Sequence, residues 1–219
     1  SIVSTEGYVV ARVTNKTLYI QEDVAAAPWK GIFIEGDALV GTTTTGAKIG
    51  QKVRVTGVQY NNFDQQQILA SKIGITSTTV AAVTPAEVTA KQVNTAAKIT
   101  AESYEGVWVK VNGPFVIPAK CDSCDGKPPG DNIQGKVKPD DDFDYDMVVV
   151  SDPGNADPLR LLDVLFARWG TGNTCAGVPC PVPPPDFRAG ATFQSVSGVM
   201  GWSFNERKLY PRVAADFVR

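Results

Sequence analysis

The sequence predicts an all-β protein made of two similar small barrels in tandem. Residues 53–68 (VRVTGVQYNNFDQQQI) align without a gap on residues 194–209 (QSVSGVMGWSFNERKL). In each copy an alternating apolar run passes through a glycine, turns at a polar patch with one phenylalanine, and returns as a second run, which is the pattern of a β-hairpin. A repeat that occurs only twice, at long spacing, indicates two domains rather than a solenoid or propeller.

The first domain, residues 1–76, is predicted to contain five strands that close into a barrel. Alternating and β-branched residues mark each strand, and the turn residues 14–16 separate the first two. Asn15 to Thr17 also matches a glycosylation sequon, but a hairpin turn explains the same residues and is the interpretation that we favour. The predicted strands are residues 7–13, 17–21, 31–35, 53–61 and 67–76.

Residues 77–103 are predicted to link the two domains. The segment is low in charge and rich in Thr, Ala and Val, and Thr84 with Glu87 has the form of a capping box that opens one short helix. The second barrel then covers residues 104–219. Two insertions rich in Pro and Gly, at about 120–144 and 167–190, interrupt it and are much longer than usual loops. Its predicted strands are residues 106–118, 145–151, 159–166, 192–201 and 208–218.

Composition excludes several classes of function. The chain has no histidine, which removes imidazole as a base, proton shuttle or metal ligand and with it most common hydrolase mechanisms. Its formal net charge of -2 gives no strong electrostatic basis for binding nucleic acid or anionic membranes. No apolar run approaches the roughly 20 residues of a membrane span, and Ser1 begins neither a basic head nor an apolar signal core. We expect a protein that is not an enzyme and does not insert into membranes.

Five segments of the two predicted barrels have a recognisable pattern: LYIQ at 18–21, GIFI at 31–34, GQKVRVTG at 50–57, YEGVWVKV at 104–111 and KLYPRVAAD at 208–216. Together they resemble the tandem oligonucleotide/oligosaccharide-binding (OB) folds of secreted bacterial nucleases and other bacterial cell-surface proteins. The resemblance implies two five-stranded OB-like Greek-key barrels and an extracellular or cell-surface location. It does not imply catalysis, because in the nucleases that activity belongs to a separate domain. The chain departs from the family in its cysteine-containing insertions and its acidic charge.

All four cysteines lie in the two insertions of the second domain. They form two short-spaced pairs, which come together only if the two loops meet. Two disulfides or one four-cysteine zinc site fit this spacing equally well. The resemblance to secreted proteins favours disulfides, and the connectivity stays open. The residues are Cys121, Cys124, Cys175 and Cys180.

An acidic run in the second domain suggests a calcium site as its functional interpretation. Carboxylates at alternating positions resemble a calcium loop, but Tyr145 stands where that loop needs glycine and Ser151 where it needs glutamate. We favour a solvated strand edge, on which the aspartates discourage pairing between edges. The calcium candidates are Asp140, Asp142, Asp144 and Asp146.

Alternation directs several aromatic side chains outward from the first barrel. Leu18, Ile20, Ile32 and Ile34 are predicted to point inward, and Tyr19, Gln21 and Phe33 outward. In OB folds such aromatics stack on bases, and cations bind phosphates. Packing under the 23–30 loop, against the second barrel or against another subunit is the interpretation that we favour. The binding-face candidates are Tyr19, Trp29, Phe33, Arg12, Lys16, Arg54, Trp202 and Phe204.

Two functions from different classes are compatible with these observations. The first is a non-catalytic extracellular structural or interaction protein, a homo-oligomer that associates into a surface assembly or filament. The alternative is a module that binds single-stranded nucleic acid or glycan and is accessory to a secreted enzyme. A carboxylate-based hydrolase would need two acids facing one cleft, which the sequence does not place. No cofactor is expected beyond a structural zinc or calcium ion as the alternative interpretation of the cysteines and aspartates.

Overall fold

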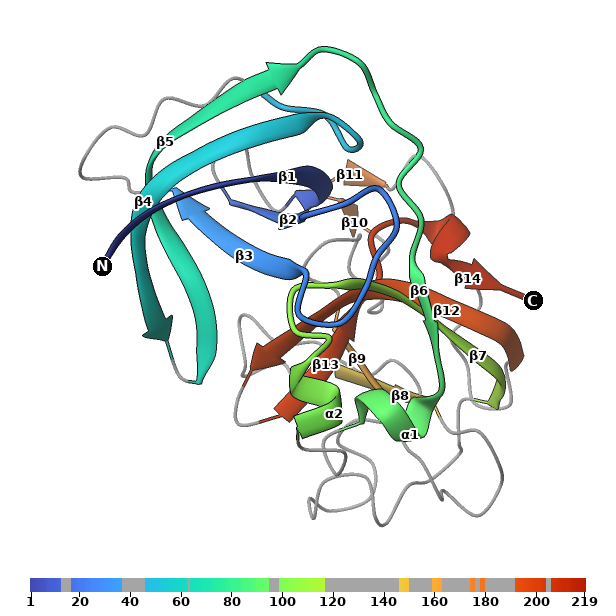
Figure 1. Ribbon diagram of the computed structural model, residues 1–219. Coiled ribbons are helices and arrows are strands. Elements are labelled where there is room, and N and C mark those ends of the chain that lie inside the picture. The colour runs from blue at the N-terminus through green and yellow to red at the C-terminus, as the bar shows by residue number, and fades with distance from the viewer. Residues whose placement is uncertain are drawn as a thin grey trace. The chain divides into compact units, whose positions relative to one another are not determined.

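Nearly all regular structure in the computed structural model of this chain is β-strand (Figure 1). The structure describes residues 1–12, 17–36, 46–62, 64–94, 99–116, 146–149, 159–162, 174–175, 178–179, 192–203 and 206–219. The strands form a closed five-stranded barrel, a seven-stranded sheet and a separate two-stranded sheet. The predicted all-β class is confirmed.

The closed barrel has the strand order β1-β2-β3-β5-β4. Neighbouring strands run antiparallel, except that β3 and β5 run parallel. The five predicted strands are confirmed, but the first begins at Ile2 rather than Gly7, because residues 2–6 pair with residues 54–58 of the fourth strand. The strands are β1 (Ile2–Arg12), β2 (Leu18–Gln21), β3 (Gly31–Gly36), β4 (Lys52–Asn62) and β5 (Gln65–Ser77).

The interior of the barrel is filled by one face of each strand. Because successive side chains of a strand point to opposite faces, residues two apart share the interior. Leu18, Ile20 and Ile34 lie in the buried core, and Ile32 packs against it, as predicted. The other members of the core are Val9, Ala47, Val53, Val55, Ile68, Ala70 and Ile73.

The seven-stranded sheet has the order β6-β7-β12-β13-β9-β8, and β14 pairs with β12 outside this path. Strands β9 and β13 run parallel, whereas β8 and β9 run antiparallel. Its strands are β6 (Ala86–Val88), β7 (Trp108–Val116), β8 (Asp146–Val149), β9 (Leu159–Leu162), β12 (Thr192–Ser203), β13 (Glu206–Tyr210) and β14 (Phe217–Val218).

This sheet repeats the strand order of the barrel. Five neighbouring strands of the sheet have the order β8-β9-β13-β12-β7. Because the barrel is closed, its order can be read from any strand, and read from β2 it is β2-β3-β5-β4-β1. The parallel pair occupies the same place in both orders, β9 with β13 and β3 with β5. A pairing between β7 and β8, which would close the second set, is not among those of the described residues.

In both copies of the sequence repeat, the two strands of the hairpin approach each other closely at a glycine. A Cβ added to Gly57 of β4 would lie 2.2 Å from the backbone oxygen of Leu69 in β5. A Cβ added to Gly198 of β12 would lie 2.7 Å from the backbone oxygen of Tyr210 in β13. In the repeat, Gly57 aligns with Gly198 and Leu69 with Tyr210. Both hairpins therefore need glycine at the same position, for the same steric reason.

The linker helix begins later than the sequence predicted. Thr84 pairs through its backbone with the 24–26 loop, since its N–H donates to Val24 O (2.8 Å) and its carbonyl accepts from Ala26 N (3.0 Å). These bonds keep the segment extended, and the predicted start at Thr84 is wrong. Helix α1 (Ala90–Val93) instead follows Thr89, whose N–H donates to the Gln92 side chain (2.8 Å). A second single turn, α2 (Ile99–Glu102), precedes β7.

The predicted strand 208–218 is interrupted, so that prediction is wrong. Pro211 follows β13 and has no N–H to continue a ladder. The Asp216 carboxylate accepts hydrogen bonds from Arg212 N (2.7 Å) and Val213 N (3.3 Å), and it pairs with the Arg212 guanidinium (3.0 Å). These contacts fold residues 214–216 into a 3₁₀ turn, after which β14 pairs back to β12.

Contacts divide the chain into two compact units. Unit 1 comprises residues 1–86, 99–109 and 199–206, and unit 2 comprises residues 87–98, 110–198 and 207–219. The domain boundaries predicted from the sequence stay a prediction.

Within the second insertion, β10 (Thr174–Cys175) pairs with β11 (Val178–Pro179).

Candidate functional site

The outer face of β2 and β3 carries two of the predicted binding aromatics. Tyr19 and Phe33 are direct cross-strand partners, and their ring centroids lie 4.8 Å apart. Tyr19 is nevertheless only 3% exposed, and Gln21 on the same face is fully buried. Little surface of the Tyr19 ring is therefore accessible to a ligand.

The segment 103–107 of the same unit contacts the strands and loop around this face. Ser103 O accepts a hydrogen bond from Trp29 N (2.6 Å), and the Glu105 carboxylate accepts one from Gln66 N (2.9 Å). Gly31 approaches Gly106 so closely that a Cβ on Gly31 would lie 2.3 Å from the Gly106 carbonyl carbon. The conformation of Gly106, with φ +74°, favours glycine as well.

The electrostatics of Tyr19 agree with this packing. Burial raises the pKa of the Tyr19 phenol above its ordinary value, a hydrogen bond with Gln65 opposes the shift, and the charge of Glu105 adds to it. Glu105 thus acts on the phenol that the OB resemblance assigned to base stacking. The chain's own segment 103–107 thus packs on the beginning of β3, next to this face.

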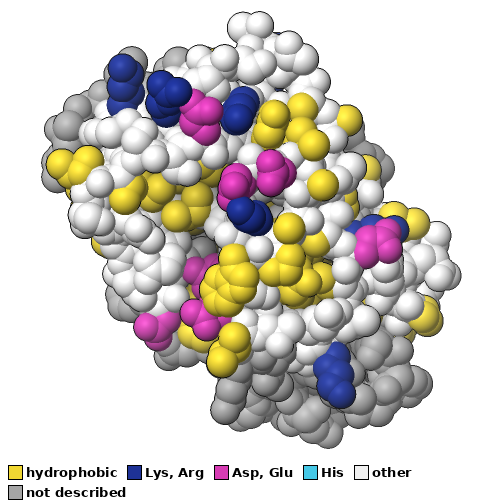
Figure 2. Space-filling model, in the orientation of Figure 1, with side chains coloured by type: hydrophobic (Ala, Val, Ile, Leu, Met, Phe, Trp, Pro, Cys, Tyr) yellow, Lys and Arg dark blue, Asp and Glu magenta, His cyan; other side chains and the backbone are white. Residues whose placement is uncertain are grey.

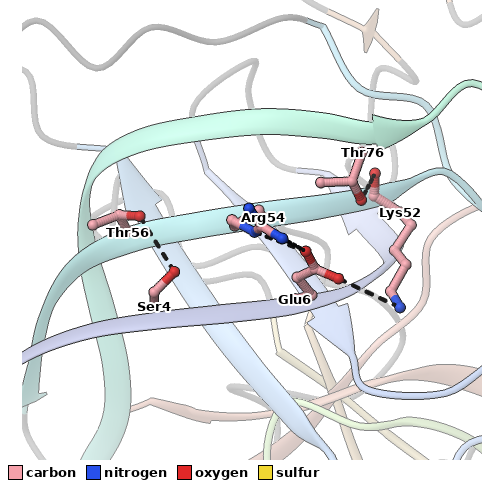
Figure 3. Close-up of polar contacts among 6 residues, drawn as sticks. All are labelled: Ser4, Glu6, Lys52, Arg54, Thr56 and Thr76. Carbon is pink, nitrogen blue, oxygen red and sulfur yellow. Dashed lines mark hydrogen bonds and ion pairs between the residues drawn. The ribbon is translucent and has the colours of Figure 1, made fainter.

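The cations proposed as phosphate contacts have different surroundings. Figure 3 shows Arg54 on β4 directed at Glu6 on β1, with an Nη2–Oε1 distance of 2.5 Å, and Lys52 at 3.5 Å from the same carboxylate. The hydrogen bond from Arg54 lowers the pKa of Glu6 below its ordinary value. Arg54 is therefore paired rather than available to a phosphate. Arg12 is half-buried at the end of β1, opposite Leu18.

Charges of both signs are interspersed on the surface. On the face drawn in Figure 2, basic side chains lie beside acidic ones and form no continuous stripe over the described residues. On this face, the described residues therefore lack the basic track by which single strands are usually held.

A groove at one end of the barrel brings together an exposed aromatic ring and charged groups. It measures about 220 Å³. Trp29 is 64% exposed and has a φ of +64°, which is rare for a bulky side chain. Lys30 pairs with Glu22 at 2.5 Å, and that hydrogen bond raises the pKa of Lys30. The groove is lined by Thr5, Glu6, Ile20, Glu22, Trp29, Lys30, Gly31 and Ile32.

Of the predicted binding residues that the structure describes, it brings only Trp29 to this groove. Trp202 is half-buried in β12. The sequence analysis missed Glu6, Glu22 and Lys30, because a single carboxylate or ammonium in a strand or turn has no distinctive pattern. The sequence Pro28-Trp-Lys-Gly31, with a large aromatic inside a turn, was the one signal that could have indicated the site.

The metal candidates fall mostly outside the described residues. Of these candidates, only the backbone of Cys175 (in β10) and Asp146 (in β8) is described. The candidates outside the described residues are Cys121, Cys124, Cys180, Asp140, Asp142 and Asp144, and the binding-face candidates Lys16 and Phe204 lie outside them too. Within the described ranges, no three His, Cys, Asp or Glu side chains gather as a metal site would require. In the same ranges, no helix has the length and apolar character needed to cross a membrane.

Comparison with known proteins gives no family for this chain. No family model matches it, and no curated protein matches it. Arguments about its function therefore rest on its own residues and geometry.

Proposed function

We propose that the chain consists of two OB-like barrels in tandem. The strand order of the closed barrel, with its single parallel pair β3 and β5, supports this for the first domain. The repeated order in the second sheet, with β9 parallel to β13, supports it for the second. The matched approach at Gly57 and Gly198 is independent support, since a chance resemblance of topology would not align a steric requirement.

As its function we propose that of a non-catalytic interaction protein of the cell exterior, which associates with copies of itself. The observation that carries this proposal is the use of the outer β2–β3 face. OB folds bind oligonucleotides and oligosaccharides on this face. Here Tyr19 on it is 3% exposed, and Gly31 beside it packs on Gly106. The nucleic-acid alternative would require segment 103–107 to leave.

An exposed apolar row on the barrel supports self-association. Ile2 of β1 lies opposite Val58 of β4, which lies opposite Leu69 of β5. Directly opposed residues share a face, and Val3, the neighbour of Ile2, packs on the core, so the row points outward. Ile2 is 83% and Val58 45% exposed. Burying such a row against a second copy would gain about 25 cal/mol for each Å² removed from water.

The test is the mass of the non-reduced protein by light scattering over a wide range of concentration. We expect growth into larger species for the native chain. Val58→Lys should suppress that growth, because it places a charge in the apolar row. Val80→Lys is the matched control, since Val80 is 57% exposed but lies outside the row.

A native chain that stays monomeric at every concentration would refute self-association. An oligonucleotide titration at two salt concentrations then examines the alternative, because binding to phosphates weakens steeply as salt is added. Salt-dependent affinity in that titration would favour the nucleic-acid module.

A further inference from the structure

The Trp29 groove has the features of a built site rather than of a surface irregularity. A residue other than glycine with positive φ is strained, and such residues persist where surrounding contacts hold them, often at ligand-binding sites. Trp29 is held by the bond from its N–H to Ser103 O (2.6 Å), and the adjoining Lys30 carbonyl accepts a hydrogen bond from Glu22 N (2.8 Å). These bonds hold the backbone in place, while Trp29 as a whole remains 64% exposed.

The indole ring is available to a ligand. Among the described residues, no hydrogen bond or aromatic contact involves the Trp29 side chain. An exposed tryptophan offers a flat apolar face together with one N–H donor. A ligand that stacks on it needs a flat apolar face of its own.

The charged groups of the groove are already balanced. Glu22 is paired with Lys30 at 2.5 Å, and Glu6 is paired with Arg54 at 2.5 Å and with Lys52 at 3.5 Å. A ligand cation would compete with these ammonium and guanidinium groups, and a ligand anion would face two carboxylates. The same groups remain good acceptors and donors for neutral hydroxyls, and Thr5, which carries a hydroxyl, also lines the groove.

The groove is also small. Pockets for drug-sized ligands measure about 300–1,000 Å³, whereas this one measures about 220 Å³. It therefore suits a ligand with one ring. We propose that the Trp29 groove binds one neutral pyranose ring of a glycan, with the apolar face of the sugar on the indole and its hydroxyls on Glu22, Lys30 and Thr5. This site lies apart from the apolar row and does not depend on self-association.

The proposal is tested by NMR of the indole N–H groups during titration with methyl glycosides. The chain contains four tryptophans, and the signal lost in Trp29→Phe identifies that of Trp29. We expect this signal to shift saturably with at least one neutral hexoside. For a ligand of this size we expect a Kd on the order of 1 mM, unchanged by added salt because no net charge is neutralised.

Variants separate stacking from polar recognition. Trp29→Ala should weaken the affinity about tenfold or more, and Trp29→Phe, which keeps a ring, should weaken it less. Glu22→Gln should weaken it while the indole signal still responds. Val80→Ala changes a residue that is 57% exposed and lies outside both the groove and the apolar row, and it should leave affinity unchanged. Binding by ligand-observed NMR to the native chain provides a readout that does not require any variant to fold.

Three results would overturn the proposal. The first is a Trp29 signal that responds to no hexoside while the protein is folded. The second is a response to choline or to an arginine amide that salt abolishes, which would assign the groove to a cation. The third is glycoside binding that Trp29→Ala leaves intact, which would place the sugar elsewhere.

Discussion

At the scale of single residues, the backbone of Trp29 is the most unusual feature of the described chain. Its φ of +64° costs an ordinary side chain about 1–2 kcal/mol, a cost that glycine largely avoids. We therefore expect Trp29→Gly to be more stable than Trp29→Ala by about 1 kcal/mol in urea unfolding. At Lys30, whose φ is not positive, the order should be reversed. Equal stability of the two Trp29 variants would argue against the positive φ.

A second residue-scale prediction concerns Tyr60 of β4. Its hydroxyl donates to the Glu35 carboxylate at 2.5 Å, and burial together with that bond raises its pKa. A raised pKa stabilises the fold at pH values below the tyrosine's unfolded pKa of about 10, and this contribution is lost as the pH rises through the folded pKa. Tyr60 should thus ionise later than an exposed tyrosine in an alkaline absorbance titration.

The Tyr60 prediction has two controls. Tyr60→Phe should remove one late-ionising group, and Glu35→Gln should move that group toward the ordinary tyrosine range because it removes the negative charge. Loss of an early-ionising group in Tyr60→Phe would contradict the prediction.

At the scale of elements, the glycines of the two hairpins make the sharpest prediction. Gly57→Ala and Gly198→Ala should each destabilise the protein by about 1–3 kcal/mol, because the new Cβ would overlap a neighbouring backbone at 2.2 Å and 2.7 Å. Gly74→Ala, in β5, should cost nothing and could stabilise, since a Cβ there meets no atom within 4 Å. Urea midpoints compare the three, and a tolerated Gly57→Ala would contradict the observed strand approach.

The sequence predicted those elements whose signal is local. Strands β2 to β5 were found because their apolar positions alternate and their ends carry turn residues. The helix at Thr84 and the unbroken strand at 208–218 were wrong for one reason: a partner distant in sequence decided the outcome. Thr84 bonds the 24–26 loop, and β14 returns to β12. Local propensity does not contain such pairings.

At the scale of the whole molecule, the sequence predicted the all-β class, and each copy of the sequence repeat forms a pair of neighbouring strands, β4 with β5 and β12 with β13. The sequence could not show that segment 103–107 packs beside the face that carries Tyr19. That packing depends on the close approach of Gly31 to Gly106, which are far apart in the sequence. Apart from the tryptophan in its turn, the composition of the Trp29 groove was also beyond sequence reasoning. Glu6 comes from β1, whereas Glu22 and Lys30 come from the loop between β2 and β3, and the fold of the barrel brings them together.

The cysteine prediction also belongs to this scale. If two disulfides join the insertions, a reductant should increase protease cleavage within residues 120–190, and a zinc chelator should not, because cross-links lower the entropy of the open chain. A zinc site would give the opposite pattern together with one bound metal by mass spectrometry. Equal cleavage under all conditions, without metal, would refute both interpretations.

The closure of the first barrel restricts how copies of this protein could join. Each of its five strands pairs with two neighbours along part of its length, so no strand offers a full-length open edge to another chain. Contacts through the paired parts of these strands must therefore be made by side chains. Assembly through it would leave the far-ultraviolet circular dichroism spectrum unchanged and would not create dye-binding cross-β structure. Growth of that kind is reversible on dilution, unlike growth by adding strands.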